Sequence, residues 1–213
     1  MLTFGNVLVV GAHYDDSELG AGGTSARLLK EGHKVYKITL TDTVVKSNDM
    51  KLDITNDRVV ENSKNACLAL GGVEELDFPL QPYGNLIYTQ ECMQAMEHII
   101  FEKNIDTVFM HFADDYNTDH LAAHKICKTA ARHVNNLLMY QSNPYIIYEH
   151  FCPNIYINIS DTVEMKRNAL KCYDSEHDRW GHLFDTNVQR NAIWGYGNHT
   201  QYAEGFCAIK MFM

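Results

Sequence analysis

Apolar runs alternate with amphipathic segments along the first two-thirds of the chain. The run NVLVV at residues 6–10 is typical of a strand buried on both faces. Residues 18–30 carry apolar side chains at helical spacing and Gly32 follows them, which predicts a helix. The same rhythm predicts further strands at 34–41, 75–78 and 107–111, and helices at 58–70, 90–103 and from 120 to about 138.

Strands that alternate with helices predict right-handed crossovers and a parallel sheet. The last third of the chain is less regular, with strands expected at 155–159 and 204–211 and a helix at 162–173. Because no repeat, low-complexity tract or linker interrupts the pattern, we expect one α/β domain over residues 1–213. Two polar segments, 43–55 and 176–198, are candidates for loops that border a binding site.

The composition is ordinary for a globular protein, with 213 residues of which 46% are hydrophobic and 21% charged. A net charge of −9 without a basic block argues against nucleic acid as a partner. We expect a cytoplasmic protein, because the sequence shows neither a membrane-length apolar span nor a leader pattern. Six scattered cysteines without a C-x-x-C pair favour free thiols.

Histidines and carboxylates gather after two of the predicted strands. The set comprises His13, Asp15, Asp16, Glu18, His111, Asp114, Asp115, Asp119 and His120. Because the loops after parallel strands meet at one edge of the sheet, these groups converge and would repel one another without a cation. A phosphate site is disfavoured, because the glycines at 20–23 do not spell G-x-G-x-x-G and G-K-[ST] does not occur.

A metal site accounts for this pattern better. His13 and Asp16 are three residues apart in a turn, and His120 at the head of a later helix can supply a third ligand. Three nitrogen and oxygen ligands leave a position for water, as in catalytic zinc sites, and imidazole favours zinc over magnesium or calcium. Asp15 is then placed to take a proton from the bound water, and Asp119, adjacent to His120, to orient a ring nitrogen.

The segment AHYDDSELGAGGT at 12–24 resembles the signature of the LmbE-like, or PIG-L, zinc deacetylases, with Tyr14 where that family has proline. RVVENSKNACLALG at 58–71, the D-H pair at 119–120 and YAEGF at 202–206 resemble later family motifs in the same order. The resemblance implies a Rossmann-like α/β three-layer sandwich with a mostly parallel sheet. It also implies an enzyme that removes acetyl groups from N-acetylated amino sugars.

The resemblance assigns His13, Asp16 and His120 as zinc ligands, Asp15 as the general base, and Arg58 as a residue near the substrate. Many relatives carry a histidine where this chain has Asn117. Asparagine can donate a hydrogen bond to an oxyanion but cannot act as an acid near neutral pH. The alternative proton donors are His111, His124, His182 and His199. Of these, His124 lies one helical turn after His120 on the same face, and we expect it near the substrate.

The segment 176–206 is rich in aromatic and polar residues. Three of its aromatic residues are candidates for a wall on which a sugar ring stacks, or else for core or oligomer packing: Trp180, Trp194 and Tyr196. Arg179 and Arg190 are candidates for contacts with substrate phosphates. By analogy with the family motif, Glu204 is expected to hold the first loop.

The sequence therefore predicts a zinc-dependent hydrolase that removes an acyl group, above all acetyl, from an N-acylated amino sugar or glycoconjugate. One alternative keeps zinc but changes the bond, as in an amidase or deformylase acting on a thiol conjugate or a sugar nucleotide. Another is a metal-binding family member without catalysis. Relatives are often oligomeric, so a homo-oligomer is expected by analogy.

Overall fold

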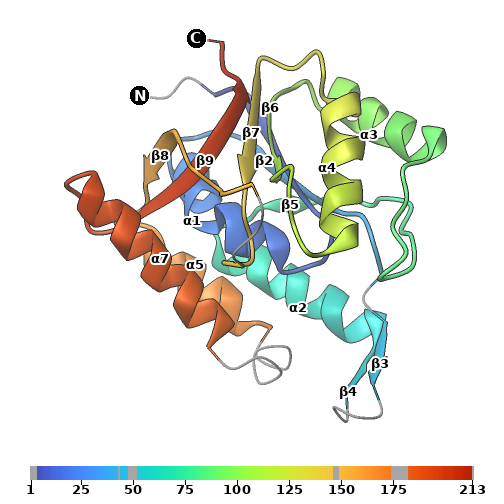
Figure 1. Cartoon of the computed structure of the whole chain (residues 1–213), viewed down its shortest axis with the longest axis horizontal. Coiled ribbons are helices and arrows are strands. Elements are labelled where there is room, and N and C mark those ends of the chain that lie inside the picture. The colour runs from blue at the N-terminus through green and yellow to red at the C-terminus, as the bar shows by residue number, and fades with distance from the viewer. Residues whose placement is uncertain (1–3, 43, 48–51, 146–148, 174–181, 213) are drawn as a thin grey trace.

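A single large sheet runs through the molecule (Figure 1). The computed structural model describes residues 4–42, 44–47, 52–145, 149–173 and 182–212, and in these residues seven strands pair in the order β5-β2-β1-β6-β7-β9-β8. The strands are β1 (Asn6–Gly11), β2 (Val35–Thr39), β5 (Glu74–Glu75), β6 (Ile105–His111), β7 (Asn136–Tyr140), β8 (Ile155–Asn158) and β9 (Ala203–Lys210). The first five in spatial order are parallel, and β9 runs antiparallel to both β7 and β8.

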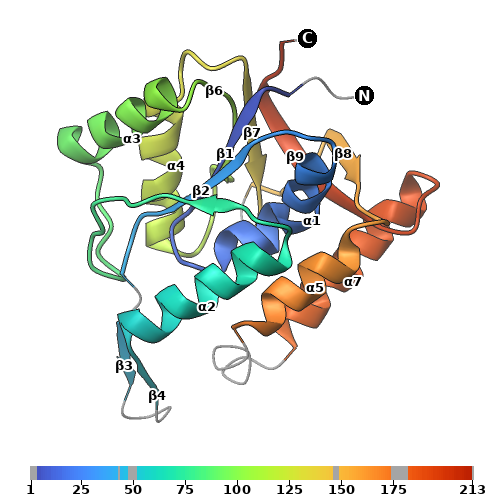
Figure 2. The same cartoon turned by 180° about the vertical axis from the view of Figure 1, so that it is seen from behind.

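Helices cover both faces of the sheet, so the expected three-layer α/β sandwich is confirmed (Figures 1 and 2). They are α1 (Asp16–Lys30), α2 (Asn56–Ala69), α3 (Gln90–Glu102), α4 (Thr118–Ala130), α5 (Val163–Lys171) and α7 (Leu183–Gly197). Val7 and Val9 of β1 point into the core shared with α1, α2, α5 and α7. Leu8 and Val10 point into the core shared with α3 and α4. Successive strand residues face opposite sides, which is why a continuous apolar run was needed here.

The order of the strands creates a crevice between β1 and β6. From β1 the chain moves outward through β2 to β5, and it then returns to β6 and continues to β7 on the other side. The connections that leave β1 and β6 therefore diverge at their carboxyl ends. Such a switch point is where open α/β sheets bind ligands.

Two expectations about secondary structure were wrong. The helix expected to reach about residue 138 ends at Ala130, and residues of its last part form β7, where Leu137 and Leu138 pair with Val108 and Phe109 of β6. Leucine is compatible with a helix as well as with a strand. Here, backbone pairing with the neighbouring strands β6 and β9 makes the segment a strand. The segment 43–55 holds a hairpin of β3 (Val45–Ser47) and β4 (Leu52–Ile54) rather than a structureless loop.

Helix α7 was also not expected, because its buried face is partly polar. Asn187 and Asn191 are buried on it beside Phe184 and Val188. A polar residue at these positions breaks the apolar period by which amphipathic helices are identified.

Helix α1 is interrupted at Ala21, within its glycine-rich part. Side chains from distant elements form hydrogen bonds with the backbone groups around this interruption. The Glu204 carboxylate of β9 accepts hydrogen bonds from the backbone N–H groups of Gly23 (3.0 Å) and Thr24 (2.7 Å). Lys166 of α5 donates to the carbonyl oxygen of Leu19 (2.8 Å) and contacts Glu204 (2.7 Å). Glu204 therefore anchors α1, next to the first loop as expected.

Among the described residues, no helix is long and apolar enough to cross a membrane.

Candidate metal centre

Three side chains from the two loops at the β1–β6 crevice point their donor atoms at one another. His13 and Asp16 come from the turn after β1, and His120 comes from the first turn of α4 after β6. His13 Nδ1 lies 3.3 Å from His120 Nε2 and 3.3 Å from Asp16 Oδ2. His120 Nε2 lies 3.3 Å from Asp16 Oδ1. All three residues are buried.

These spacings fit a metal ion. A tetrahedral ion with bonds of about 2.0–2.2 Å holds its ligand atoms roughly 3.3 to 3.6 Å apart. Two imidazoles and one carboxylate form a donor set that suits zinc, and three protein ligands leave one position for water or substrate. The sequence-predicted ligands are thus brought together from positions more than a hundred residues apart.

Each imidazole is held by a carboxylate at its other nitrogen. His13 Nε2 contacts Asp119 Oδ2 at 3.1 Å, and His120 Nδ1 contacts Asp115 Oδ2 at 2.9 Å. Asp119 also accepts hydrogen bonds from the backbone N–H groups of Gly84 (2.7 Å) and Leu86 (2.9 Å), which fixes its own orientation. Carboxylates in this arrangement set the ring orientation and basicity of histidine ligands.

The structure shows which ring nitrogen Asp119 contacts. Asp119 orients His13 and not its neighbour His120, because the start of α4 turns its carboxylate away from the adjacent ring. Asp115 orients His120 instead, and it was not singled out from the sequence beyond the acidic set. Its position five residues before His120, in the loop that leads into α4, was the available signal.

The electrostatics of the cluster favour a positive charge. Burial by itself would lower the pKa of His13, but hydrogen bonds with Asp119 and Asp16 raise it to about 9. Burial likewise opposes protonation of His120, whereas the charge of Asp16 and the hydrogen bond with Asp115 raise its pKa to about 10. In the absence of a metal, both rings are therefore protonated, and their positive charge balances the surrounding carboxylates. A divalent cation bound between the rings and Asp16 would supply this positive charge in place of the protons.

His111, at the end of β6, packs beneath the cluster. Its ring stacks on His120 with centroids 4.1 Å apart, and its Nε2 accepts a hydrogen bond from the backbone N–H of Ala12 (3.0 Å). Burial and the nearby His120 lower its pKa to about 4. A neutral ring whose Nε2 accepts this hydrogen bond carries its proton on Nδ1, and the ring supports the loop after β1. His111 Nε2 also lies 3.2 Å from Asp16 Oδ2.

Asp15 stands between the ligands His13 and Asp16. It occupies the N-cap position of α1, but its side chain makes no capping hydrogen bond. Burial and the neighbouring charge of Asp16 raise its pKa to about 7. The carboxylate therefore does not cap the helix, and Asp15 is the sequence neighbour of Asp16.

Asn117 is the N-cap of α4. Its Oδ1 accepts a hydrogen bond from the backbone N–H of Asp119 (2.8 Å), while the backbone N–H of Asn117 donates to Asp115 Oδ1 (2.9 Å). With the amide oxygen engaged at the helix end, the remaining group of the side chain is the NH₂ donor.

Other residues named from the sequence lie in different surroundings. Arg58 is exposed in the first turn of α2. His124 Nδ1 donates to the His111 carbonyl oxygen (3.0 Å), so its ring ties α4 to β6. His182 and His199 are exposed at the two ends of α7. Trp180 and Arg179 lie outside the described residues.

Trp194 and Tyr196, two of the candidates for an aromatic wall, lie in different surroundings. Trp194 packs near Phe151 and Tyr156, and the Arg190 guanidinium lies 4.7 Å from its ring. Tyr196 is 86% exposed. Trp194 thus packs within the fold. Arg190 also donates to the Gln141 side chain (2.9 Å) and backbone carbonyl, so its guanidinium is already used within the fold.

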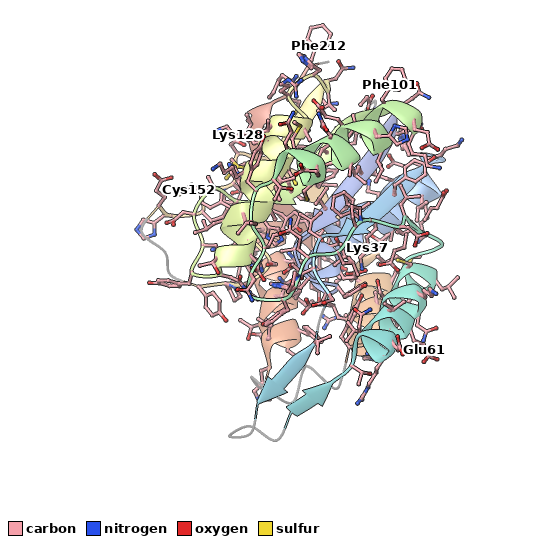
Figure 3. All side chains as sticks on the ribbon, turned by 90° about the vertical axis from the view of Figure 1, so that its right-hand side faces the viewer. Lys37, Glu61, Phe101, Lys128, Cys152 and Phe212 are labelled. Atoms are coloured by element: carbon pink, nitrogen blue, oxygen red, sulfur yellow. The ribbon has the colours of Figure 1, made fainter. Side chains whose placement is uncertain are left out.

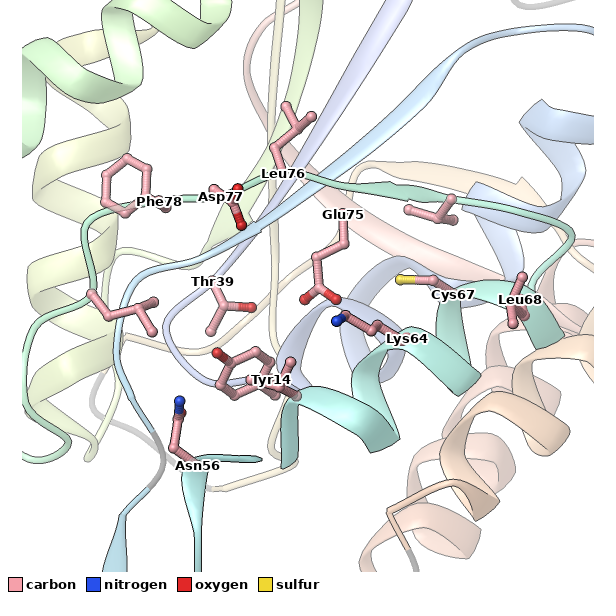
Figure 4. A pocket seen from close by; sticks show the side chains of 13 residues that line it. Tyr14, Thr39, Asn56, Lys64, Cys67, Leu68, Glu75, Leu76, Asp77 and Phe78 are labelled. Carbon is pink, nitrogen blue, oxygen red and sulfur yellow. The ribbon is translucent and has the colours of Figure 1, made fainter. Parts of the chain in front are cut away.

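A cavity of about 460 Å³ lies between α2 and the β2–β5 edge of the sheet (Figure 4). Tyr14, the residue between His13 and Asp15, forms part of its wall, together with Thr39 and Glu75. Its other walls are mainly apolar side chains such as Val60 and Phe78. The metal-ligand candidates do not line this cavity, but the segment that carries them does border it.

The chain matches a known protein family over much of its length. A family model described as GlcNAc-PI de-N-acetylase (PIG-L) matches residues 8–131. The match covers more than half of the chain, so the chain belongs to the PIG-L family, and the resemblance drawn from its motifs is confirmed.

The chain is also similar to individual proteins of known sequence or structure. An uncharacterised deacetylase, YaiS, from Escherichia coli K12 is 28% identical over 176 residues, which cover 79% of this chain and 90% of the relative. The N,N'-diacetylchitobiose deacetylase from Pyrococcus horikoshii superposes with a TM-score of 0.81 at 18% identity, covering 97% of this chain and 84% of that one. GalB, a 4-carboxy-2-hydroxymuconate hydratase from Pseudomonas putida, has a TM-score of 0.79 at 18% identity, with 98% of each chain covered. The fold is therefore shared with another reaction class, and activity must be argued from the site.

Proposed function

We propose that this protein is a zinc-dependent deacetylase that acts on an N-acetylated amino sugar or a glycoconjugate that carries one. The observation that carries the proposal is the convergence of donor atoms from His13, Asp16 and His120. The two ring nitrogens lie 3.3 Å apart, each lies 3.3 Å from one oxygen of Asp16, and each ring has a carboxylate on its outer nitrogen. The family match supports deacetylation, and the name of the P. horikoshii neighbour supports an N-acetylated sugar.

The residues of the chain divide the chemistry among them. Bound zinc would lower the pKa of a coordinated water to about 7 and polarise the amide carbonyl. The Asp15 carboxylate takes the proton of the attacking water and then gives it to the leaving amine. The Asn117 NH₂ group donates a hydrogen bond to the oxygen that gains negative charge. Because one carboxylate both accepts and returns the proton, no histidine is required at position 117.

The test is an assay of free amine release from the zinc-loaded protein across N-acetylglucosamine, diacetylchitobiose, sugar nucleotides and N-formyl and thiol-conjugate analogues. We expect acetylated amino sugars to be the best substrates. Asp15→Asn should lower kcat by about 10² to 10⁴-fold, the range of general base catalysis, without loss of zinc. An Asp15→Asn protein that turns over at the parental rate would refute the base assignment. Preference for the formyl or thiol-conjugate substrates would replace the proposed substrate class.

A further inference from the structure

A lysine occupies the middle of strand β2, which is buried along its whole length. Lys37 of β2 is 1% exposed and lies on the face of the sheet opposite to its neighbours Tyr36 and Ile38. Figure 3 labels it in the interior of the molecule, near α2. Burying an ammonium group is costly unless it is paired and fully hydrogen-bonded. Its partners therefore show what the residue does.

The Lys37 ammonium group is surrounded by acceptors from four other segments. It donates to Glu18 Oε1 of α1 (2.8 Å), to Ser63 Oγ of α2 (2.8 Å) and to the Tyr14 carbonyl oxygen (2.6 Å), and it lies 3.3 Å from the Tyr173 hydroxyl. Burial would lower the pKa of Lys37, but the Glu18 carboxylate holds it well above its ordinary value, so the group stays charged.

The contact with Tyr14 links this cluster to the metal centre. The Tyr14 carbonyl oxygen accepts from Lys37 and also from the Tyr173 hydroxyl (2.9 Å), and Tyr14 lies between the ligand His13 and Asp15. Two buried donors on one carbonyl fix the peptide group that leads directly into Asp15. By contrast, replacement of a buried ion pair with apolar residues is often neutral or stabilising, so stability is a weak reason for the pair.

We propose that Lys37 and Tyr173 are positioning residues for the reaction: they hold the Tyr14 carbonyl, and thereby set the place of the Asp15 carboxylate beside the metal. This inference rests on the proposed function. A displacement of a reacting group by about 1 Å can cost on the order of 10²-fold in rate, so a loosened peptide group at this point has a measurable effect.

The first test replaces the ion pair as a unit, with Lys37→Met and Glu18→Leu together, so that no unpaired charge is left in the core. We expect kcat for the best acetylated substrate to fall roughly tenfold or more, while KM, zinc content and Tm change little. The second test is Tyr173→Phe, which removes one hydroxyl and keeps the ring. We expect a smaller fall in kcat, and less than additive behaviour when it is combined with the pair replacement, because both act on one carbonyl.

The matched control is the other buried Lys–Glu pair in the same layer. Lys166 contacts Glu204 at 2.7 Å and donates to the Leu19 carbonyl rather than to Tyr14. Lys166→Met together with Glu204→Gln removes both charges and keeps a side-chain oxygen that can accept from the Gly23 or Thr24 backbone, and we expect a lower Tm with kcat unchanged.

The outcomes separate the two proposals. If the pair replacement keeps kcat within twofold of the parent, the positioning role is refuted. Should that variant fail to fold, an unchanged kcat in Tyr173→Phe refutes it equally. Full turnover by Asp15→Asn refutes the base assignment instead, whatever the Lys37 variants show.

Discussion

Two clusters of buried charge share the segment 13–16, and they differ in the source of their positive charge. In the first, Asp16, Asp115 and Asp119 converge on His13 and His120, and the described contacts of these carboxylates include no lysine or arginine side chain. In the second, Glu18 meets Lys37, a cation that belongs to the chain. A cluster that lacks its own cation is suited to take one from solution, and a self-neutralised cluster is suited to hold its neighbours still.

The comparison also explains the different geometry of the two clusters. The Lys37 ammonium group has three N–H donors, and the fold supplies an acceptor for each of them. No donor of this group is therefore left for a ligand. The inner nitrogens of His13 and His120 instead face each other and Asp16, with their outer nitrogens held. One cluster is closed and the other is open at its centre. Three experiments test this contrast.

Metal removal should have the largest effect. Chelation should abolish amide hydrolysis and lower Tm, because an ion that binds only the folded state stabilises it by about 4 kcal/mol at a thousandfold excess over Kd. Zinc should restore both, as followed by elemental analysis and thermal unfolding. His120→Ala should neither bind zinc nor respond to it, whereas the exposed control His98→Ala should behave as the parent. Full activity in metal-free protein would contradict the open-cluster interpretation.

Replacement of the amide at the head of α4 should have the next largest effect. Asn117→Asp keeps an oxygen that accepts from the Asp119 N–H and so keeps the helix cap, but it removes the NH₂ donor. We expect kcat to fall by about 10² to 10³-fold, as for loss of an oxyanion donor. Asn117→Ala should add a loss of about 1 kcal/mol in unfolding free energy, because the cap disappears as well. Equal rates for Asn117→Asp and the parent would remove Asn117 from the mechanism.

The carboxylates behind the rings should have the smallest effect on turnover and a clear one on metal affinity. Asp115→Asn and Asp119→Asn should each weaken zinc binding by about 10 to 100-fold, measured by competition with a chelator. Asp114→Asn is the control, because its carboxylate accepts from the Glu149 backbone away from the rings. Unchanged affinity in both test variants would show that the rings are oriented without these contacts.

Much of the site could be predicted from the sequence because the relevant signals are local. His13, Asp15 and Asp16 lie in one turn after an obvious strand, and His120 follows another strand. Parallel topology then requires the two loops to meet at one edge of the sheet. The alternation of strands and helices in the first 110 residues likewise follows from the period of the apolar residues.

What the sequence by itself determined is the His13, Asp16 and His120 donor set and the mostly parallel α/β class. The tertiary structure decided which carboxylate faces which ring, because Asp115 and Asp119 lie close to His120 in sequence and only the turn into α4 separates their directions. It decided that residues 136–140 form a strand, because their backbone pairs with β6 on one side and with β9 on the other. It also decided the role of Lys37, whose partners come from segments far apart along the chain and could not be paired by spacing.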